Sequence, residues 1–255
     1  MNRESTEERA CETVCEGMPR WLEVLLSSMG LVFLSPFLGI GGLLASTSRG
    51  PILYRQERVG LHGRKFVLYK FRSMKVVDST LQITAKNDDR ITWAGKILRK
   101  TKIDELPELW NVLKGDMSFV GPRPEVERYV DMNDPLWKQA LAARPGITDP
   151  VTLSLRNEEE ILGQVAGDRQ QFYLETLQPL KLAGYVEYLR KRDCWSDVNI
   201  IFKTVMAVIL PGKAPSLISE RLSADRRDIE QHGRSCEGMQ TESRHPEIIP
   251  QEDTH

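Results

Sequence analysis

The amino-acid sequence predicts a mainly helical α+β fold with one small β-hairpin, joined to an apolar segment that belongs in a membrane. Three observations predict this class. Residues 24–45 carry no charged side chain, and residues 50–74 alternate apolar and basic side chains around two glycines. Between residues 87 and 210 the chain shows a series of helix starts, helix ends and turns. A length of 255 residues leaves room for one domain or two small ones.

The apolar segment 24–45 is long enough to cross a bilayer, because as a straight helix it would measure about 33 Å. Ser35-Pro36 lies in its middle, where a proline removes a backbone hydrogen bond and kinks or breaks a helix. Two arms of about 16 Å could instead enter the membrane and return to the same side. The residues alone leave a spanning and a re-entrant segment equally open. The acidic residues before the segment argue against a signal peptide.

The charge distribution predicts an anionic ligand or surface for the middle of the chain. The net charge of −1 argues against wholesale nucleic-acid binding. Between residues 46 and 114, however, basic side chains are about twice as numerous as acidic ones. Their position after the apolar segment favours a cytosolic C-terminal side. A solvated basic face is the alternative. The four cysteines form no metal or disulfide pattern, which fits a reduced, cytosolic setting.

The first elements after the membrane segment are a hairpin and a basic helix. Residues 50–74 read as two strands around Gly60 and Gly63. Residues 87–103 begin with cap-like side chains and continue as a helix with Ile97 and Leu98 inward. That orientation leaves a row of basic side chains outside: Lys96, Arg99, Lys100 and Lys102.

An adjacent acid pair, Asp104 and Glu105, begins the next helix. Asp104 is predicted as its N-cap, and Gly115 is predicted to end it. Glu105 then falls in the first turn, where unpaired N–H groups favour a negative charge. Capping explains Asp104 about as well as catalysis does. It does not explain why a basic belt and a stiff Gly-Pro-Arg-Pro turn at residues 121–124 flank the pair.

The remaining segments read as turns and helices. Residues 143–148 are predicted as a turn, and Asn157 and Glu160 have the spacing of a capping box at a helix start. Residues 194–210 form a strongly apolar helix, too short to span a membrane, that either enters the core or lies at an interface. Its predicted cap is Ser196 or Asp197.

Several of these motifs together resemble one family. They are Ser35-Pro36, Arg58-Val59-Gly60, "YKFRSM", "GKILRKTKIDELPELWNVLKGDMSFVGPRPE", "RPGIT" and "WSDVNIIFKTV". The chain resembles, over roughly residues 18–210, the bacterial sugar transferases. These are monotopic phosphoglycosyl transferases that begin glycan assembly on a polyprenol carrier. The long Asp-Glu-Leu to Gly-Pro-Arg-Pro core makes the resemblance very specific.

The resemblance implies an enzyme that moves a sugar-1-phosphate from a UDP-sugar to undecaprenyl phosphate and releases UMP. Asp104 matches the family's nucleophile, which forms a covalent aspartyl-phosphosugar intermediate, and Glu105 matches its Mg²⁺ ligand. Ser35-Pro36 matches the break that makes the membrane helix re-entrant. The family's substrate- and phosphate-binding residues match Lys70, Arg99, Arg123 and Asp197.

The resemblance also implies an organisation. A polar tail (1–17), a re-entrant membrane helix (18–46), a cytosolic transferase domain (47–210) and a disordered tail (211–255) are expected in the small form of the family. Interfacial amphipathic helices would hold the protein on the cytosolic face of the bacterial inner membrane. The expected partners are a UDP-sugar, undecaprenyl phosphate and membrane lipids, with a homodimer as an option and no nucleic acid.

One departure from the family concerns the substrate. Many members continue the Arg-Pro-Gly-Ile-Thr turn with Gly-Trp-Ala, whereas this chain has Asp149-Pro150-Val151. The surface that faces the sugar or the acceptor can therefore differ. Two other functions use part of the same pattern. A membrane-tethered scaffold needs the apolar segment but not the acid pair, and a lipid phosphatase needs Asp104 but no nucleotide.

Overall fold

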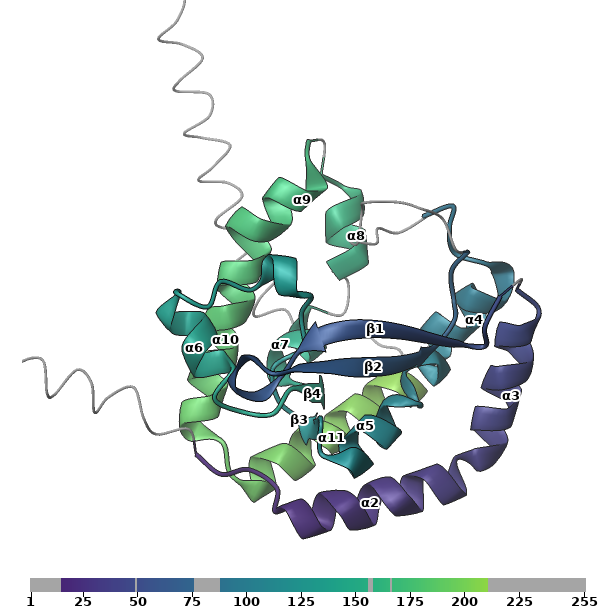
Figure 1. Ribbon diagram of the computed structural model, residues 1–255, viewed down its shortest axis with the longest axis horizontal. Helices are drawn as coiled ribbons and strands as arrows, with labels where there is room; N and C mark the ends of the chain where they lie inside the picture. Colours follow the sequence, from purple (N-terminus) through teal and green to yellow (C-terminus); the bar gives the residue numbers. More distant parts are fainter. Residues whose placement is uncertain (1–14, 49, 76–87, 156–157, 166, 211–255) are drawn as a thin grey trace, which may run out of the picture. The chain divides into compact units, whose positions relative to one another are not determined.

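The computed structural model describes residues 15–48, 50–75, 88–155, 158–165 and 167–210. Two helices joined at a sharp bend come first in this part of the chain. Helices α2 (Arg20–Phe33) and α3 (Ser35–Ser46) are bent by 63° (Figure 1). Pro36 lies in the first turn of α3, where its missing N–H leaves no hydrogen bond unmade. The break therefore falls at the predicted Ser-Pro step.

The length and composition of these helices bear on the membrane question. Among the described residues, no single helix is both long and apolar enough to cross a bilayer. The bent pair α2 and α3 meets that requirement only when its two arms are taken together.

The predicted hairpin is confirmed. Strands β1 (Leu53–Val59) and β2 (Lys65–Phe71) pair antiparallel, from Leu53 opposite Phe71 to Val59 opposite Lys65. The short 3₁₀ turn η1 (Leu61–Gly63) joins them, with left-handed backbone at His62 and Gly63. Leu68 is buried on this hairpin and belongs to a core cluster with Val112 and Met117.

Helix α4 (Trp93–Thr101) carries the basic row. It begins at Thr92, whose side chain accepts a hydrogen bond from the Gly95 N–H, and ends at a left-handed Lys102. Leu98 is fully buried, as predicted, but Ile97 is 42% exposed. The prediction for Ile97 is wrong because consecutive helical residues point about 100° apart, and only a narrow stripe of this helix faces the core.

The acid pair does not begin a helix in the predicted way. Asp104 and Glu105 lie in a separate 3₁₀ turn, η2 (Ile103–Glu105), which follows the left-handed Lys102. Helix α5 (Glu108–Lys114) begins after Pro107 with no side-chain cap. The N-cap prediction for Asp104 is therefore wrong. Gly115, with φ of 92°, ends α5 as predicted.

A second, parallel pair of strands follows. Strands β3 (Ser118–Val120) and β4 (Gly146–Thr148) pair with Ser118 opposite Gly146. The predicted turn at 143–148 thus contains a strand. Between the strands lie η3 (Glu127–Tyr129) and α6 (Pro135–Ala140), and α7 (Pro150–Ser154) follows β4.

Helices form the rest of the described chain. They are α8 (Glu158–Gly163), α9 (Arg169–Phe172), the π-helical turn η4 (Tyr173–Leu177), α10 (Gln178–Lys191) and α11 (Cys194–Ile209). A capping box of Asp193 and Ser196 begins α11, so its cap is Asp193 and not the predicted Ser196 or Asp197. The predicted capping box at Asn157 and the tails 1–14 and 211–255 lie outside the described residues.

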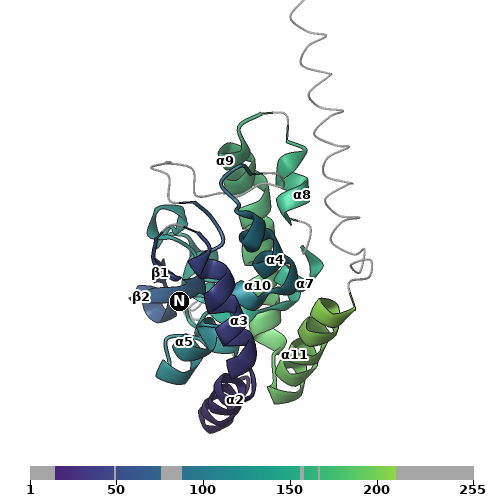
Figure 2. The ribbon, with the colours of Figure 1, turned by 90° about the vertical axis from the view of Figure 1, so that its right-hand side faces the viewer.

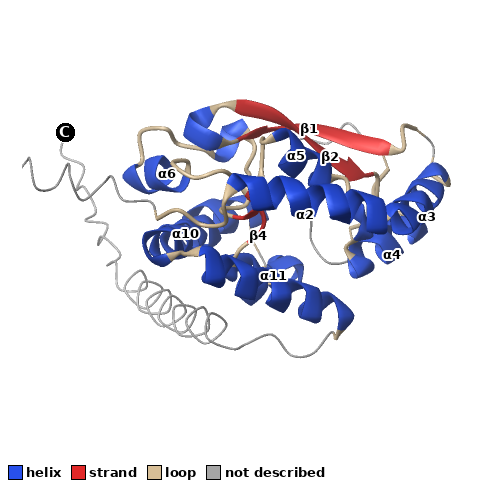
Figure 3. Cartoon of the chain, turned by 90° about the horizontal axis from the view of Figure 1, so that it is seen from below, coloured by secondary structure: helices blue, strands red, loops and turns tan. Residues whose placement is uncertain are grey.

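Helices α3 and α4 pack against η2, the turn that carries the acid pair. Helix α3 contacts α4, η2 and β2, and α2 contacts α5 (Figures 1 and 2). Helix α11 packs on β3 and β4, and Figure 3 shows α2 and α11 on the same side of the fold. These two helices and α3 carry an apolar surface, defined by exposed large side chains: Trp21, Leu25, Met29, Val32, Phe33, Phe37, Ile40, Leu43, Trp195, Phe202, Val205 and Ile209.

Candidate active site

Glu105 lies at the centre of a cluster of charged side chains. Its Oε1 atom is 3.1 Å from Lys70 Nζ and 2.7 Å from Arg123 Nη2. Lys70 belongs to β2, and Arg123 belongs to the turn after β3. Lys102 Nζ is a third, more distant cation, 3.9 Å from the same oxygen. Three separate segments therefore bring positive charge to one carboxylate.

These contacts fix the charge of Glu105. Burial alone would raise the pKa of its carboxyl, but the charges of Lys70, Arg123 and Lys102 hold that pKa well below its usual range. Glu105 is consequently an anion throughout the physiological pH range.

Asp104 has the opposite environment. Its side chain is buried, and its Oδ1 has no hydrogen-bond partner among the described residues. Burial and the charge of Glu105 raise the pKa of the Asp104 carboxyl, although Lys70, Lys102 and Arg99 oppose the rise. Buried polar groups are rarely left unpaired, and perturbed carboxyls gather at functional sites. Asp104 is thus a desolvated carboxyl group and a candidate for a functional role.

A third carboxylate, Glu108, belongs to the cluster and was missed in the sequence. Its Oε1 is 3.0 Å from Lys70 Nζ, and the side chain is almost fully buried. Burial raises the pKa of Glu108, partly offset by the charge of Lys70. Its spacing of three residues after Glu105 could have indicated a shared face.

Two predicted site residues have partners outside this cluster. Arg99 forms an ion pair with Glu159 of α8. Asp197 is fully buried, where it accepts hydrogen bonds from the Met18 N–H at 2.7 Å, from Arg192 at 2.6 Å and from the Tyr188 hydroxyl. The structure brings Asp104, Glu105, Lys70 and Arg123 together. It places Asp197 where it ties the start of α11 to the segment before α2.

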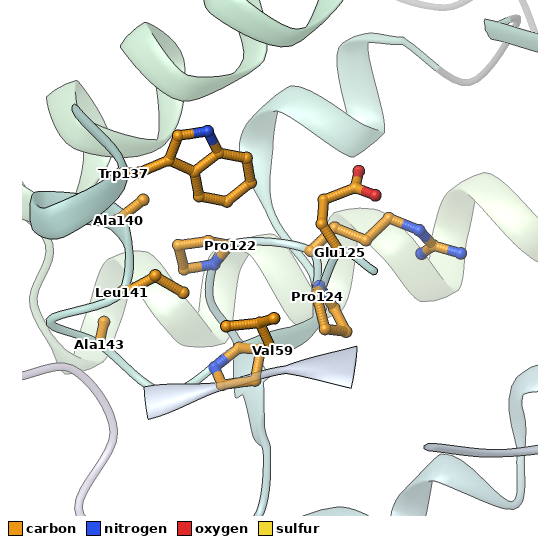
Figure 4. A pocket seen from close by; sticks show the side chains of 10 residues that line it. Val59, Pro122, Pro124, Glu125, Trp137, Ala140, Leu141 and Ala143 are labelled. Atoms are coloured by element: carbon orange, nitrogen blue, oxygen red, sulfur yellow. The ribbon is translucent and has the colours of Figure 1, made fainter. Parts of the chain in front are cut away.

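The turn that carries Arg123 borders a small pocket. Its lining is mostly apolar, with Trp137 and Leu141 on one side and the prolines of the turn on the other (Figure 4). The full lining is Val59, Pro122, Arg123, Pro124, Glu125, Trp137, Ala140, Leu141, Ala143 and Pro145. The two prolines, which have fixed φ angles, restrict the backbone on either side of Arg123.

The carboxylates suit a magnesium ion that is shared with a substrate. In the described part of the chain, no group of three or more metal-binding side chains forms a complete protein cage. Mg²⁺ usually takes only one or two protein carboxylates, with water and phosphate oxygens as its other ligands. The single carboxylate of Glu105, whose pKa is held low, fits that requirement.

Comparison with known proteins gives the family. A family model described as "Bacterial sugar transferase" matches residues 15–211. The chain belongs to the bacterial sugar transferase family. The match includes every residue of the charged cluster and both arms of the bent helix pair, so it confirms the resemblance.

Curated relatives of this sugar transferase are about one-third identical to it. An undecaprenyl-phosphate galactose phosphotransferase of Salmonella typhimurium is 35% identical over 213 residues, which cover 75% of this chain and 40% of the relative. A UDP-glucose:undecaprenyl-phosphate glucose-1-phosphate transferase of Klebsiella pneumoniae is 36% identical, with 72% and 38% covered. The exopolysaccharide production protein ExoY of Rhizobium meliloti is 33% identical, with 75% and 85% covered. The chain spans about two fifths of the length of the first two relatives.

Proposed function

We propose that this bacterial sugar transferase moves a sugar-1-phosphate from a UDP-sugar to undecaprenyl phosphate and releases UMP. The observation that carries the proposal is the acid pair. Asp104 is a buried carboxylate with one oxygen that finds no hydrogen-bond partner among the described residues, and its neighbour Glu105 is held ionised by Lys70 and Arg123. The names of the relatives, which include undecaprenyl phosphate, support the same reaction.

In the first half-reaction, a carboxylate oxygen of Asp104 attacks the phosphorus that bears the sugar. The new bond joins that oxygen to phosphorus, and the bond from phosphorus to the bridging oxygen breaks. UMP leaves with the electron pair. Asp104 must be ionised to attack, and the charges of Lys70, Lys102 and Arg99 favour its ionised form against burial. An aspartate needs no separate base, since its carboxyl loses its proton without one.

In the second half-reaction, a phosphate oxygen of undecaprenyl phosphate attacks the same phosphorus. The bond to Asp104 breaks, and the carboxylate is restored. Both halves bring an anion to a phosphate, so positive charge must surround the reacting atoms. Lys70 and Arg123 are held in place by Glu105, and we assign them to the phosphate oxygens of the substrate.

A magnesium ion, which we propose that Glu105 helps to hold, would neutralise the pyrophosphate charge when bound. Glu105 is suited to this because its pKa is held low, so the carboxylate is charged before any ion arrives. Asp104 remains the nucleophile.

We further propose that the protein acts at the cytosolic face of the bacterial inner membrane as a monotopic, re-entrant protein. Two observations support this. The bent pair α2 and α3 has the composition of a broken membrane segment. Helices α2, α3 and α11 also expose many large apolar side chains, as helices that lie at a membrane interface do. In this arrangement the charged cluster would lie at the level of the lipid headgroups, where the phosphate of undecaprenyl phosphate could reach it.

UMP release tests the proposed function. Purified protein is incubated with undecaprenyl phosphate, Mg²⁺ and a panel of UDP-sugars, and both UMP and lipid-linked sugar are measured. One UDP-sugar should yield UMP and lipid-linked sugar in equal amounts. Release of inorganic phosphate from lipid phosphate without any nucleotide would indicate a phosphatase instead. No turnover with any UDP-sugar would favour a scaffold.

A further inference from the structure

The turn that carries Arg123 is tied to both strand pairs. On one side, the Gly121 N–H donates to Thr148 O at 3.0 Å, and the Gly146 N–H donates to Pro122 O at 3.0 Å. These bonds join the start of the turn to β4. Pro122 has no N–H, so its carbonyl is the only backbone group that it can pair.

On its other side, the turn is tied to β1. The Val59 N–H donates to Glu125 O at 2.9 Å, and Arg58 Nη1 donates to Pro124 O at 3.1 Å. Arg123 thus lies between two anchored ends. The anchor to β1 includes a charged side chain, that of Arg58. The position of the turn therefore depends on the position of Arg58.

The Glu125 side chain joins Arg58 of β1 to η4 and α10. Its Oε2 is 3.6 Å from Arg58 Nη1. Its Oε1 accepts a hydrogen bond from the Tyr173 hydroxyl and is 3.8 Å from Lys181 Nζ. The carboxylate is 13% exposed, so solvent screens these contacts only weakly. This one half-buried carboxylate therefore links β1, η4 and α10.

Charge explains why an anion is needed there. Two guanidinium groups, those of Arg58 and Arg123, flank the same short turn. Burial lowers the pKa of Arg58, the charge of Glu125 opposes that effect, and the charge of Arg123 adds to it. Without the negative charge of Glu125, the Arg58 guanidinium would lose the largest charge that offsets its burial and its repulsion by Arg123.

We propose that Glu125 is a positioning residue that holds Arg123 in the orientation in which it meets Glu105 and the substrate phosphates. Glu125 acts through Arg58 and the backbone of the turn and does not itself contact the substrate. The inference rests on the proposed function, because it assigns Arg123 to the substrate.

The test compares Glu125→Gln with Glu127→Gln. Glu127 is a matched control because it lies two residues on and pairs with Lys65 of the same hairpin at 2.6 Å, but its side chain is 69% exposed. Glu125→Gln should raise the KM for the UDP-sugar about tenfold, since one loosened charged contact is worth that order of affinity. Glu127→Gln should change KM less than about twofold.

A double-mutant cycle with Arg123→Ala separates positioning from general stability. If Glu125 acts through Arg123, Glu125→Gln should change KM little once Arg123 is absent. Losses that multiply in the double variant would overturn the proposal, as would equal effects of Glu125→Gln and Glu127→Gln. If Glu125→Gln does not fold, Tyr173→Phe serves instead, because it removes one hydrogen bond to Glu125 and keeps the charge. Tyr173→Phe should also raise the KM for the UDP-sugar, and it should do so only while Arg123 is present.

The two proposals fail separately. A wild-type protein without UMP release would refute the proposed function. A wild-type protein with normal UMP release, alongside a Glu125→Gln variant indistinguishable from the control, would refute the positioning role alone.

Discussion

At the scale of single residues, the acid pair combines two opposed environments at adjacent positions. Glu105 contacts two cations through one oxygen, whereas Asp104 Oδ1 has no hydrogen-bond partner in the described part of the chain. The pKa of Glu105 is therefore lowered and that of Asp104 is raised. One carboxylate stabilises the fold in its ionised form, and the other is destabilising once ionised. The proposed role of Asp104 as nucleophile would account for such a destabilising charge.

This difference predicts opposite stability effects for two similar substitutions. Asp104→Asn should raise the thermal unfolding temperature at neutral pH, because it removes a buried charge. Glu105→Gln should lower the free energy of unfolding by about 1–3 kcal/mol, because Arg123 and Lys70 lose a charged partner. Asp104→Asn should also reduce UMP release by roughly a thousandfold or more, as expected for a nucleophile. Thermal unfolding in detergent and the UMP assay measure both effects.

The pH dependence supplies the control for this prediction. The pKa of Asp104 is raised, so the folded state binds its proton more tightly, and the stability gain of Asp104→Asn should vanish at acidic pH and grow as pH rises. The pKa of Glu105 is lowered, so the deficit of Glu105→Gln should be present at neutral pH and shrink on acidification. A loss of stability in Asp104→Asn at neutral pH would contradict this account of the pair.

Sequence reasoning located these residues but not their surroundings. The adjacent acids and the Gly-Pro-Arg-Pro turn were visible as motifs, and the structure brings Arg123 to Glu105. The cap prediction for Asp104 failed because a left-handed Lys102 leads from α4 into the separate turn η2, and α5 begins only after Pro107. No local pattern indicates this arrangement. Burial raises the pKa of Asp104, and the packing of the chain brings Glu108 into the charged cluster. Burial is a property of the packed chain.

At the scale of elements, helix α3 is joined to the site through a glycine. A Cβ atom built on Gly41 would lie 2.6 Å from the Phe71 ring and 2.8 Å from the Ile103 side chain. Ile103 directly precedes Asp104, so the approach of α3 bears on the position of the proposed nucleophile. Glycine is required at this point because any side chain would push the helix away.

Gly41→Ala tests this contact, with Gly39→Ala as its matched control on the same helix. Nothing lies within 4 Å of a Cβ on Gly39. Overpacking at Gly41 should cost about 1–3 kcal/mol of stability and reduce turnover. Gly39→Ala should leave turnover unchanged and raise the free energy of unfolding by up to about 1 kcal/mol, since alanine favours the helix. Equal behaviour of the two variants in thermal unfolding and UMP release would show that α3 does not set the site.

The elements that could be predicted are those with strong local patterns. The hairpin, the break at Ser35-Pro36 and the Gly115 end of α5 each follow from a few neighbouring residues. The parallel pair of β3 and β4 could not be predicted. Each strand is three residues long, which is too short to show an alternating pattern of apolar and polar residues, and its partner is far away in the chain.

At the scale of the whole described unit, the apolar surface and the site together require a defined topology. If the protein uses a cytosolic UDP-sugar, as we propose, the residues after α3 must face the cytosol. A bend of 63° between α2 and α3 allows the chain to enter and leave on one side. The N-terminus would then be cytosolic too.

Cysteine labelling tests that topology. In a variant without its native cysteines, single cysteines at positions 5 and 80 should both resist an impermeant thiol reagent in intact cells, and both should react after the cells are opened. Ser35→Ala combined with Pro36→Ala should shift the segment toward spanning and reduce activity, because proline costs a helix interior about 3 kcal/mol. Labelling at position 5 but not 80 in the unmodified segment would mean that the segment spans the membrane.

Intact-protein mass spectrometry tests the central claim, covalent transfer through Asp104, most directly. The protein is mixed with Mg²⁺ and the UDP-sugar that it uses, without lipid acceptor. We predict a mass increase of one sugar phosphate, an equal amount of UMP, and loss of the added mass when undecaprenyl phosphate is supplied. Asp104→Asn should show neither the adduct nor UMP. An active enzyme that forms no adduct, with intersecting double-reciprocal plots for the two substrates, would contradict the account and indicate direct transfer in a ternary complex.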